Sequence, residues 1–111
     1  MYVWCLRAAG WIVESVSDGE AAIVVAAELQ PDVILMDLRL PLLGGIEAAR
    51  RLKGDERTRN VPIVACTGDR STSLLDVQAA GCDELLVKPI EPDELRELLE
   101  RIVESRSEGS E

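Results

Sequence analysis

Apolar residues in this chain fall into short continuous runs that alternate with segments of helical spacing. Three runs, at residues 33–36, 61–66 and 85–87, are uninterrupted. Continuous rather than alternating apolarity is typical of strands covered on both faces, as in a parallel sheet. Residues 11–16 are short and rich in β-branched side chains, and they predict a further strand.

Helices are predicted between and after these runs. Ser17 to Glu20 has the pattern of a capping box, which opens a helix that ends at Leu29. Residues 46–53 and 73–80 have helical spacing, and Gly81 is placed to cap the second of these helices. A last helix starts near Pro92. Its apolar stripe consists of Leu95, Leu98, Leu99, Ile102 and Val103. We expect one domain over residues 1–104 and a disordered acidic tail over 105–111.

Repeated strand–helix units predict an α/β fold, a doubly wound parallel sheet with helices on both faces. In such open sheets ligands bind outside the carboxyl ends of the strands. The residues that close each strand are therefore the first candidates for a functional site.

Three of the predicted strands end in chemically useful side chains: Asp37, Thr67 and Lys88. At one edge of a sheet, a carboxylate, a hydroxyl and an ammonium group suit phosphoryl transfer. Asp37 would be the nucleophile, Lys88 would balance charge on the phosphoryl oxygens and Thr67 would donate a hydrogen bond. Gly68 would leave room for the group. Taken singly, the three are ordinary: a turn residue, a strand residue with a local hydrogen bond, and a solvated charge.

The order and spacing of several segments resemble the response regulator receiver family over residues 1 to about 104. The matching segments are Asp18–Ala22, Pro31–Asp37, Leu40–Pro41 with Gly44–Gly45, Pro62–Gly68, Ala80–Asp83 and Val87–Pro89. The resemblance implies a flavodoxin-like fold in which Asp37 accepts phosphate from a histidine kinase or phosphotransfer protein. It implies magnesium as cofactor, with Thr67 and Lys88 binding the phosphoryl oxygens, and a cis Lys88–Pro89 bond. Apart from self-catalysed phosphorylation and dephosphorylation, no enzyme activity is implied.

The start of the chain departs from this family. Members open with a strand that ends in acidic residues, which hold the magnesium, whereas Met1 to Ala9 resembles the middle of the family's first helix. With Asp37 and the backbone carbonyl of Arg39 alone, the metal site is incomplete, and magnesium binding is expected to be weak or lost. Either Met1 is an internal residue of a longer protein, or the chain is a degenerate receiver.

In the family's strand order, 2-1-3-4-5, the missing first strand is central. Its absence would expose one edge of the strand at 33–36, which would favour aggregation or a homo-oligomer paired through that edge.

Two further differences from the family concern the site. Leu85 replaces the aromatic residue that usually lies three positions before the lysine, and is read either as a weakened switch or as plain core. Arg39 and Asp69 could pair across the cleft and hinder hydrolysis of an acyl phosphate.

Composition indicates which classes of partner and which cellular compartment to expect. A formal net charge of −9 disfavours nucleic acid and anionic membranes, and no apolar run is long enough to span a bilayer. Three widely spaced cysteines and no histidine make zinc or a disulfide framework improbable, and Cys66 and Cys82 are interpreted as core residues of a cytoplasmic protein.

The favoured function is a phosphorelay receiver that signals to a downstream protein target through its last helix and strand. The alternative is a pseudo-receiver, a protein interaction module without phosphorylation. A hydrolase with an aspartyl nucleophile is disfavoured, because Arg39 stands where such enzymes commonly carry a second acid.

Overall fold

The computed structural model of the protein describes residues 3–7, 12–16, 18–38 and 45–109, and these form one layered α/β domain. The elements in chain order are β1 (Val3–Arg7), β2 (Ile12–Val16), α1 (Gly19–Leu29), β3 (Val33–Asp37), α2 (Gly45–Gly54), β4 (Ile63–Thr67), α3 (Leu74–Ala79), β5 (Glu84–Val87) and α4 (Pro92–Gly109). The predicted alternation of strands and helices is thus confirmed from β2 onward.

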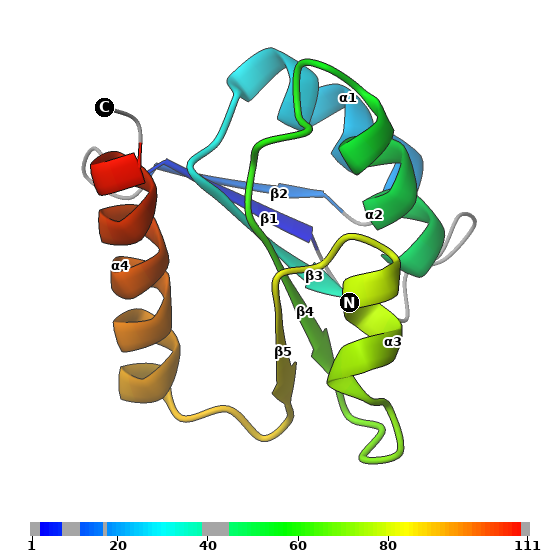
Figure 1. The fold of residues 1–111 in the computed structure, drawn as a ribbon, viewed down its shortest axis with the longest axis vertical. Helices are drawn as coiled ribbons and strands as arrows, with labels where there is room; N and C mark the ends of the chain where they lie inside the picture. Colours follow the sequence, from blue (N-terminus) through cyan, green and yellow to red (C-terminus); the bar gives the residue numbers. More distant parts are fainter. Residues whose placement is uncertain (1–2, 8–11, 17, 39–44, 110–111) are drawn as a thin grey trace.

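The five described strands form one sheet in the order β2-β1-β3-β4-β5 (Figure 1). Strand β3 pairs in parallel with β4, and β4 pairs in parallel with β5. Strand β1 lies antiparallel to both of its neighbours, β2 and β3. One central strand therefore runs against the direction of the other four.

The first described residues correct two expectations. Residues 3–7 form a strand rather than part of a helix, and this strand fills the place between β2 and β3. Only residues 8–11 separate β1 from β2, which is too few for the crossover that parallel neighbours need but enough for an antiparallel hairpin. Strand β3 is consequently paired on both sides, so the predicted exposed edge, and with it the argument for an oligomer formed through that edge, is wrong.

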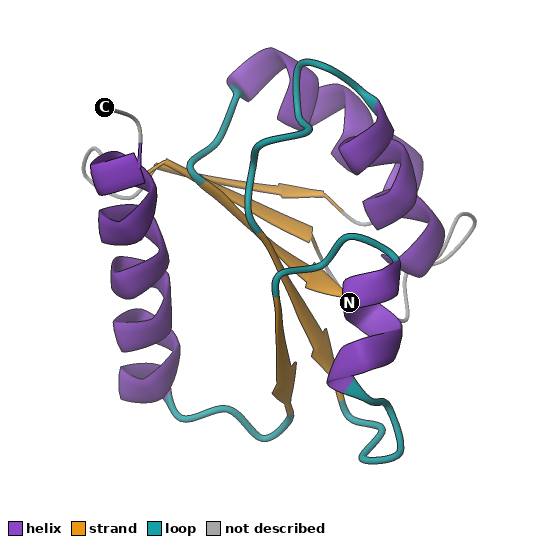
Figure 2. Ribbon diagram, in the orientation of Figure 1, coloured by secondary structure: helices purple, strands orange, loops and turns teal. Residues whose placement is uncertain are grey.

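Helices cover both faces of the sheet, with α1, α2 and α3 on one side and α4 on the other (Figure 2). Alternate residues of β3 point to the two sides: Ile34 and Met36 belong to the core under α1–α3, whereas Val33 and Leu35 belong to the core under α4. All five residues of β3 are buried, as predicted from its continuous apolarity. Each large apolar side chain buried in this way contributes about 1.5–3 kcal/mol, which makes β3 the centre of both cores.

The helix ends follow local capping chemistry. Asp18, rather than Ser17, caps α1, and its Oδ1 accepts a hydrogen bond from the amide of Ala21 at 2.8 Å. Gly81 follows α3 with a φ of 105°, a conformation that glycine adopts without a steric penalty, which confirms its capping role.

Helix α4 is longer than predicted. It continues past Ser105 to Gly109 and so includes most of the segment for which a disordered tail was expected. Residues 105–108 contain no proline or glycine, so nothing in their covalent structure stops the helix before Gly109. No helix in the described part of the chain combines the length and the apolarity needed to cross a membrane.

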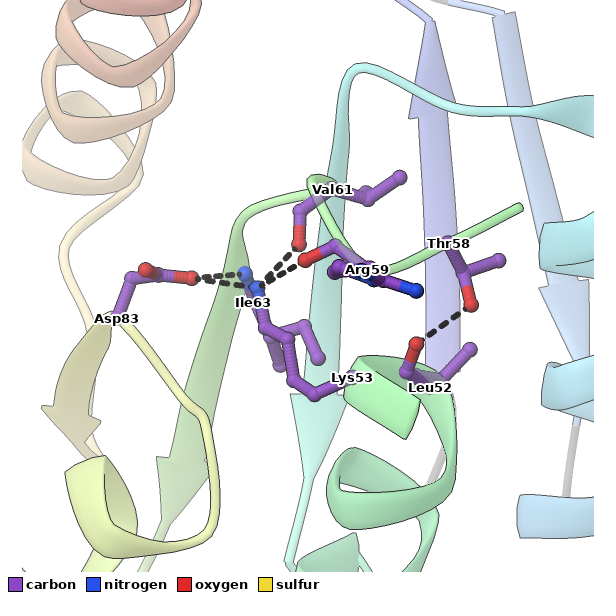
Figure 3. A network of polar contacts seen from close by, with 7 residues as sticks. All are labelled: Leu52, Lys53, Thr58, Arg59, Val61, Ile63 and Asp83. Atoms are coloured by element: carbon purple, nitrogen blue, oxygen red, sulfur yellow. Dashed lines mark hydrogen bonds and ion pairs between the residues drawn. The ribbon is translucent and has the colours of Figure 1, made fainter. Parts of the chain in front are cut away.

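A polar network ties the C-terminal end of α2 to the amino ends of β4 and β5 (Figure 3). The Lys53 ammonium donates to the carbonyl oxygens of Val61 (2.8 Å) and Arg59 (3.3 Å), and lies 3.4 Å from the Asp83 carboxylate. The same Oδ2 of Asp83 accepts from the amide of Ile63 at 2.8 Å. Since three segments share one ammonium group and one carboxylate, the network fixes where the helix ends relative to the sheet.

The network predicts that Lys53→Met is destabilising. Methionine keeps the apolar stem but removes the donors to two backbone carbonyls and the cation beside Asp83. We expect the free energy of unfolding, measured by urea denaturation, to fall by about 1–3 kcal/mol.

The matched control is Arg51→Met on the same helix, whose guanidinium pairs with Glu47 on an exposed surface. A change within about 0.5 kcal/mol is expected there. Equal losses in the two variants would contradict the role assigned to the network.

Candidate functional site

Backbone hydrogen bonds align the carboxyl ends of β3, β4 and β5 at one edge of the sheet. Asp37 is in register with Cys66, and Thr67 is in register with Val87. Beyond these pairs, the amide of Leu38 donates to the carbonyl of Cys66 (3.0 Å), and the amide of Lys88 donates to the carbonyl of Thr67 (2.7 Å). The ladder thus places Asp37, Thr67 and Lys88 at the ends of three adjacent strands, as their positions in the sequence predicted.

Asp37 and Lys88 are in direct contact. The Lys88 ammonium lies 2.5 Å from Oδ2 of Asp37, a charge-assisted hydrogen bond between residues 51 positions apart. The Asp37 carboxylate is buried, whereas the Lys88 side chain is half exposed. A buried carboxylate is costly unless a cation is close, and the lysine supplies one while its stem still reaches solvent.

Thr67 is buried at the end of β4, between the strands that carry the other two residues. Its Oγ1 accepts a hydrogen bond from the amide of Asp69 at 3.0 Å. The hydroxyl hydrogen of a threonine that accepts in this way remains available as a donor. Gly68 has no atom within 4 Å of the place that a Cβ would occupy, so there is room beside Thr67.

Two smaller predictions are confirmed beside the site. The Lys88–Pro89 peptide bond is cis. Cys66 and Cys82 are buried free cysteines, and burial raises the pKa of the Cys66 thiol to about 12 and that of Cys82 to about 11. Both thiols therefore stay protonated at neutral pH, as expected of core residues rather than reactive groups.

Leu85 is half buried and packs against the core under α1–α3. That position agrees with its interpretation as a core residue.

Other expected site residues lie outside the described part of the chain. Arg39 falls within residues 39–44, so neither its carbonyl as a metal ligand nor its pairing with Asp69 can be placed. Asp69 itself accepts from the amide and the hydroxyl of Ser71 at 2.9 and 2.6 Å. Among the described residues, no three histidine, cysteine or acidic side chains gather where they could hold a metal ion.

The residue just before the helix predicted over 46–53 lies against the site. Gly45 is the first residue of α2 and is buried beside the Asp37–Leu38 peptide. The only signal in the sequence was the Gly44–Gly45 pair, which predicts a turn as readily as a close backbone approach.

Comparison with known proteins gives one family. The family model for the response regulator receiver domain matches residues 1–100. The curated relatives include the DNA-binding response regulator MtrA of Mycobacterium tuberculosis, 38% identical over 93 residues, and the phosphate regulon transcriptional regulatory protein PhoB of Pseudomonas aeruginosa, 33% identical over 111 residues. These matches cover 81% and 98% of this chain but only 39% and 48% of the relatives. The chain thus spans less than half the length of these relatives.

Solved structures agree in fold. The receiver domain of the sensor histidine kinase PA1611 from Pseudomonas aeruginosa, which was solved with a magnesium ion coordinated in the active site cleft, is 37% identical with a TM-score of 0.72 over 79% of this chain and 73% of that one. The chemotaxis protein CheY4 of Vibrio cholerae is 31% identical with a TM-score of 0.75 over 85% of this chain and 79% of that one.

These similarities confirm the flavodoxin-like fold, and the family match covers most of the chain and includes the three strand ends. This protein belongs to the response regulator receiver domain family of two-component signalling.

Proposed function

We propose that Asp37 accepts a phosphoryl group from a histidine kinase or phosphotransfer protein. The observation that carries this proposal is the contact between Asp37 and Lys88, with Thr67 at the end of the strand between them. A nucleophile, a cation and a hydroxyl donor are thereby held at one edge of a rigid sheet, where phosphoryl transfer needs positioning and charge balance above all.

The bonds that form and break in the transfer belong to Asp37 and the phosphodonor. A carboxylate oxygen of Asp37 forms a P–O bond while the P–N bond of the phosphohistidine breaks, and the electron pair of that bond goes to the imidazole nitrogen, which takes a proton from solvent. The ammonium of Lys88 moves from the carboxylate to the phosphoryl oxygens, for which its half-exposed side chain has freedom. The Thr67 hydroxyl then donates to a second phosphoryl oxygen.

Magnesium binding by this chain is proposed to be weak or lost. Among the described residues, Asp37 is not part of a group of three histidine, cysteine or acidic side chains that could hold a metal ion. Mg²⁺ requires near-octahedral oxygen ligation and is usually held by one or two carboxylates. The carbonyl of Arg39, beyond the described residues, would add one oxygen.

The output is proposed to pass through protein contacts of α4 and β5, to a downstream protein target in the cytoplasm. Relatives such as MtrA are named as DNA-binding regulators, but more than half of each lies outside the match with this chain. The chain's own net charge of −9 opposes contact with DNA phosphates.

A second candidate is a pseudo-receiver that binds partners without being phosphorylated. The incomplete set of metal ligands among the described residues favours it. Acyl-phosphate formation separates the two candidates.

Incubation with a small phosphodonor such as acetyl phosphate, in millimolar MgCl₂, is expected to add the mass of one phosphoryl group to the intact protein. Asp37→Asn should abolish the addition, because the amide cannot form the acyl phosphate. Asp76→Asn, which changes an exposed carboxylate of α3 outside the site, is the control and should retain it. Intact-protein mass spectrometry makes the measurement, and an unmodified wild-type protein would favour the pseudo-receiver.

Lys88→Met is expected to slow this phosphorylation by roughly 100-fold, the effect of losing one preorganised electrostatic group in a transition state. Methionine preserves the stem but removes the cation beside Asp37. The control is Arg96→Met on α4, which removes an exposed cation paired with Asp93 and should leave the rate unchanged. Similar rates in wild type and Lys88→Met would rule out the role assigned to Lys88.

Mg²⁺ titration followed by calorimetry is expected to show no saturable binding in the millimolar range, because one carboxylate does not complete the coordination sphere. The PA1611 receiver domain, whose structure holds the ion, serves as the positive control. Binding of comparable strength in the two proteins would disprove the proposed loss.

A further inference from the structure

The N-terminal end of α2 touches the backbone of the candidate acceptor. A Cβ added to Gly45 would lie 2.7 Å from Cα of Leu38, 2.9 Å from the carbonyl oxygen of Asp37 and 3.1 Å from Cδ2 of Leu38. The first two atoms belong to the peptide unit that leaves Asp37, and the amide of Gly45 lies 3.4 Å from the Leu38 carbonyl. The start of α2 and the end of β3 are thus closer together than they could be if residue 45 had a side chain.

The helix has little freedom to retreat from this contact. Ala48, Ala49 and Leu52 on its inner face are fully buried in the core under α1–α3. At its other end, Lys53 holds the carbonyls of Val61 and Arg59 and lies beside Asp83 (Figure 3). Packed interiors transmit strain rather than absorb it.

The strand end is the part that would move. Residues 34–36 are paired with strands on both sides, whereas Asp37 is paired only with β4, and its carbonyl faces the helix. Relief of a 2.7 Å contact requires a displacement of roughly half an ångström, and displacements of about 1 Å in a reacting group can cost 10²-fold in rate. The position of Asp37 relative to Lys88 therefore depends on a residue that lacks a side chain.

We propose that Gly45 is a positioning residue for the site: its missing side chain lets α2 rest on the Asp37–Leu38 peptide and so sets the distance between the Asp37 carboxylate and the Lys88 ammonium. The kinetic consequence rests on the proposed phosphorylation of Asp37, whereas the geometric one does not. Gly54, the last residue of the same helix, has no atom within 4 Å of the place that a Cβ would occupy and offers a matched control.

The first measurement is phosphorylation by acetyl phosphate. Gly45→Ala is expected to lower the rate by about tenfold, whereas Gly54→Ala should stay within about twofold of wild type. Rates are corrected for the folded fraction from circular dichroism, in a stabilising osmolyte that favours the compact state. Equal rates in the two variants would overturn the proposal, and so would a Gly45→Ala protein that does not fold under these conditions, since the residue would then serve folding rather than position.

The second measurement does not depend on phosphorylation. The chain has lysine at two positions only, Lys53 and Lys88, so acylation of amines followed by peptide mass spectrometry reports on the site with Lys53 as internal reference. In Gly45→Ala the acylation rate of Lys88 relative to Lys53 is expected to rise about threefold, because the ammonium loses part of its pairing with Asp37. An unchanged ratio in folded protein refutes the proposal, even where wild type accepts no phosphoryl group.

A third variant tests which atoms are responsible. Leu38→Ala combined with Gly45→Ala removes the contact with the Leu38 side chain but leaves both backbone contacts. The double variant is expected to remain as slow as Gly45→Ala, with the same rise in Lys88 acylation. Return of both values to those of Leu38→Ala alone would show that only side chains collide, and would overturn the proposal.

Discussion

A buried carboxylate at the end of β3 needs a cation, and the parallel ladder brings one from 51 residues away. The contact exists because β3, β4 and β5 end at the same edge, so that Asp37, Thr67 and Lys88 leave the sheet side by side. Transfer of an unpaired carboxylate into the protein would cost several kcal/mol. The same pairing that makes the buried acid tolerable also supplies the charge balance that a phosphoryl group would require.

This pairing depends on rigid support at both ends of α2. At one end Lys53 joins the helix to the segments that start β4 and β5. At the other end Gly45 rests directly on the peptide that follows Asp37. The helix therefore spans the sheet from its amino edge to its carboxyl edge. Rigid neighbours of this kind are what hold a reactive group to within a fraction of an ångström.

The centre of the sheet is completed in an unusual direction. Strand β1 takes the position between β2 and β3, but it runs antiparallel to both. Hydrogen bonding along β3 is satisfied by either direction, and the short connection to β2 permits only one. The acceptor strand is thus paired with a strand on each side.

Sequence alone was sufficient for the elements and for the residues at their ends. Continuous apolar runs identified β3 and β4 because strands buried on both faces are mostly apolar, and the polar residues that end these strands were the site candidates. Spacing and composition could not foresee the strand at Val3–Arg7, since a short apolar segment suits either a helix or a strand until a sheet offers it hydrogen bonds. Nor could they foresee the contact at Gly45, because a glycine pair signals freedom of the backbone and not what the backbone will touch. Tertiary structure decided these two features, as well as the distance between Asp37 and Lys88. Each is set by how separate elements pack against one another, and the sequence pattern does not specify that packing.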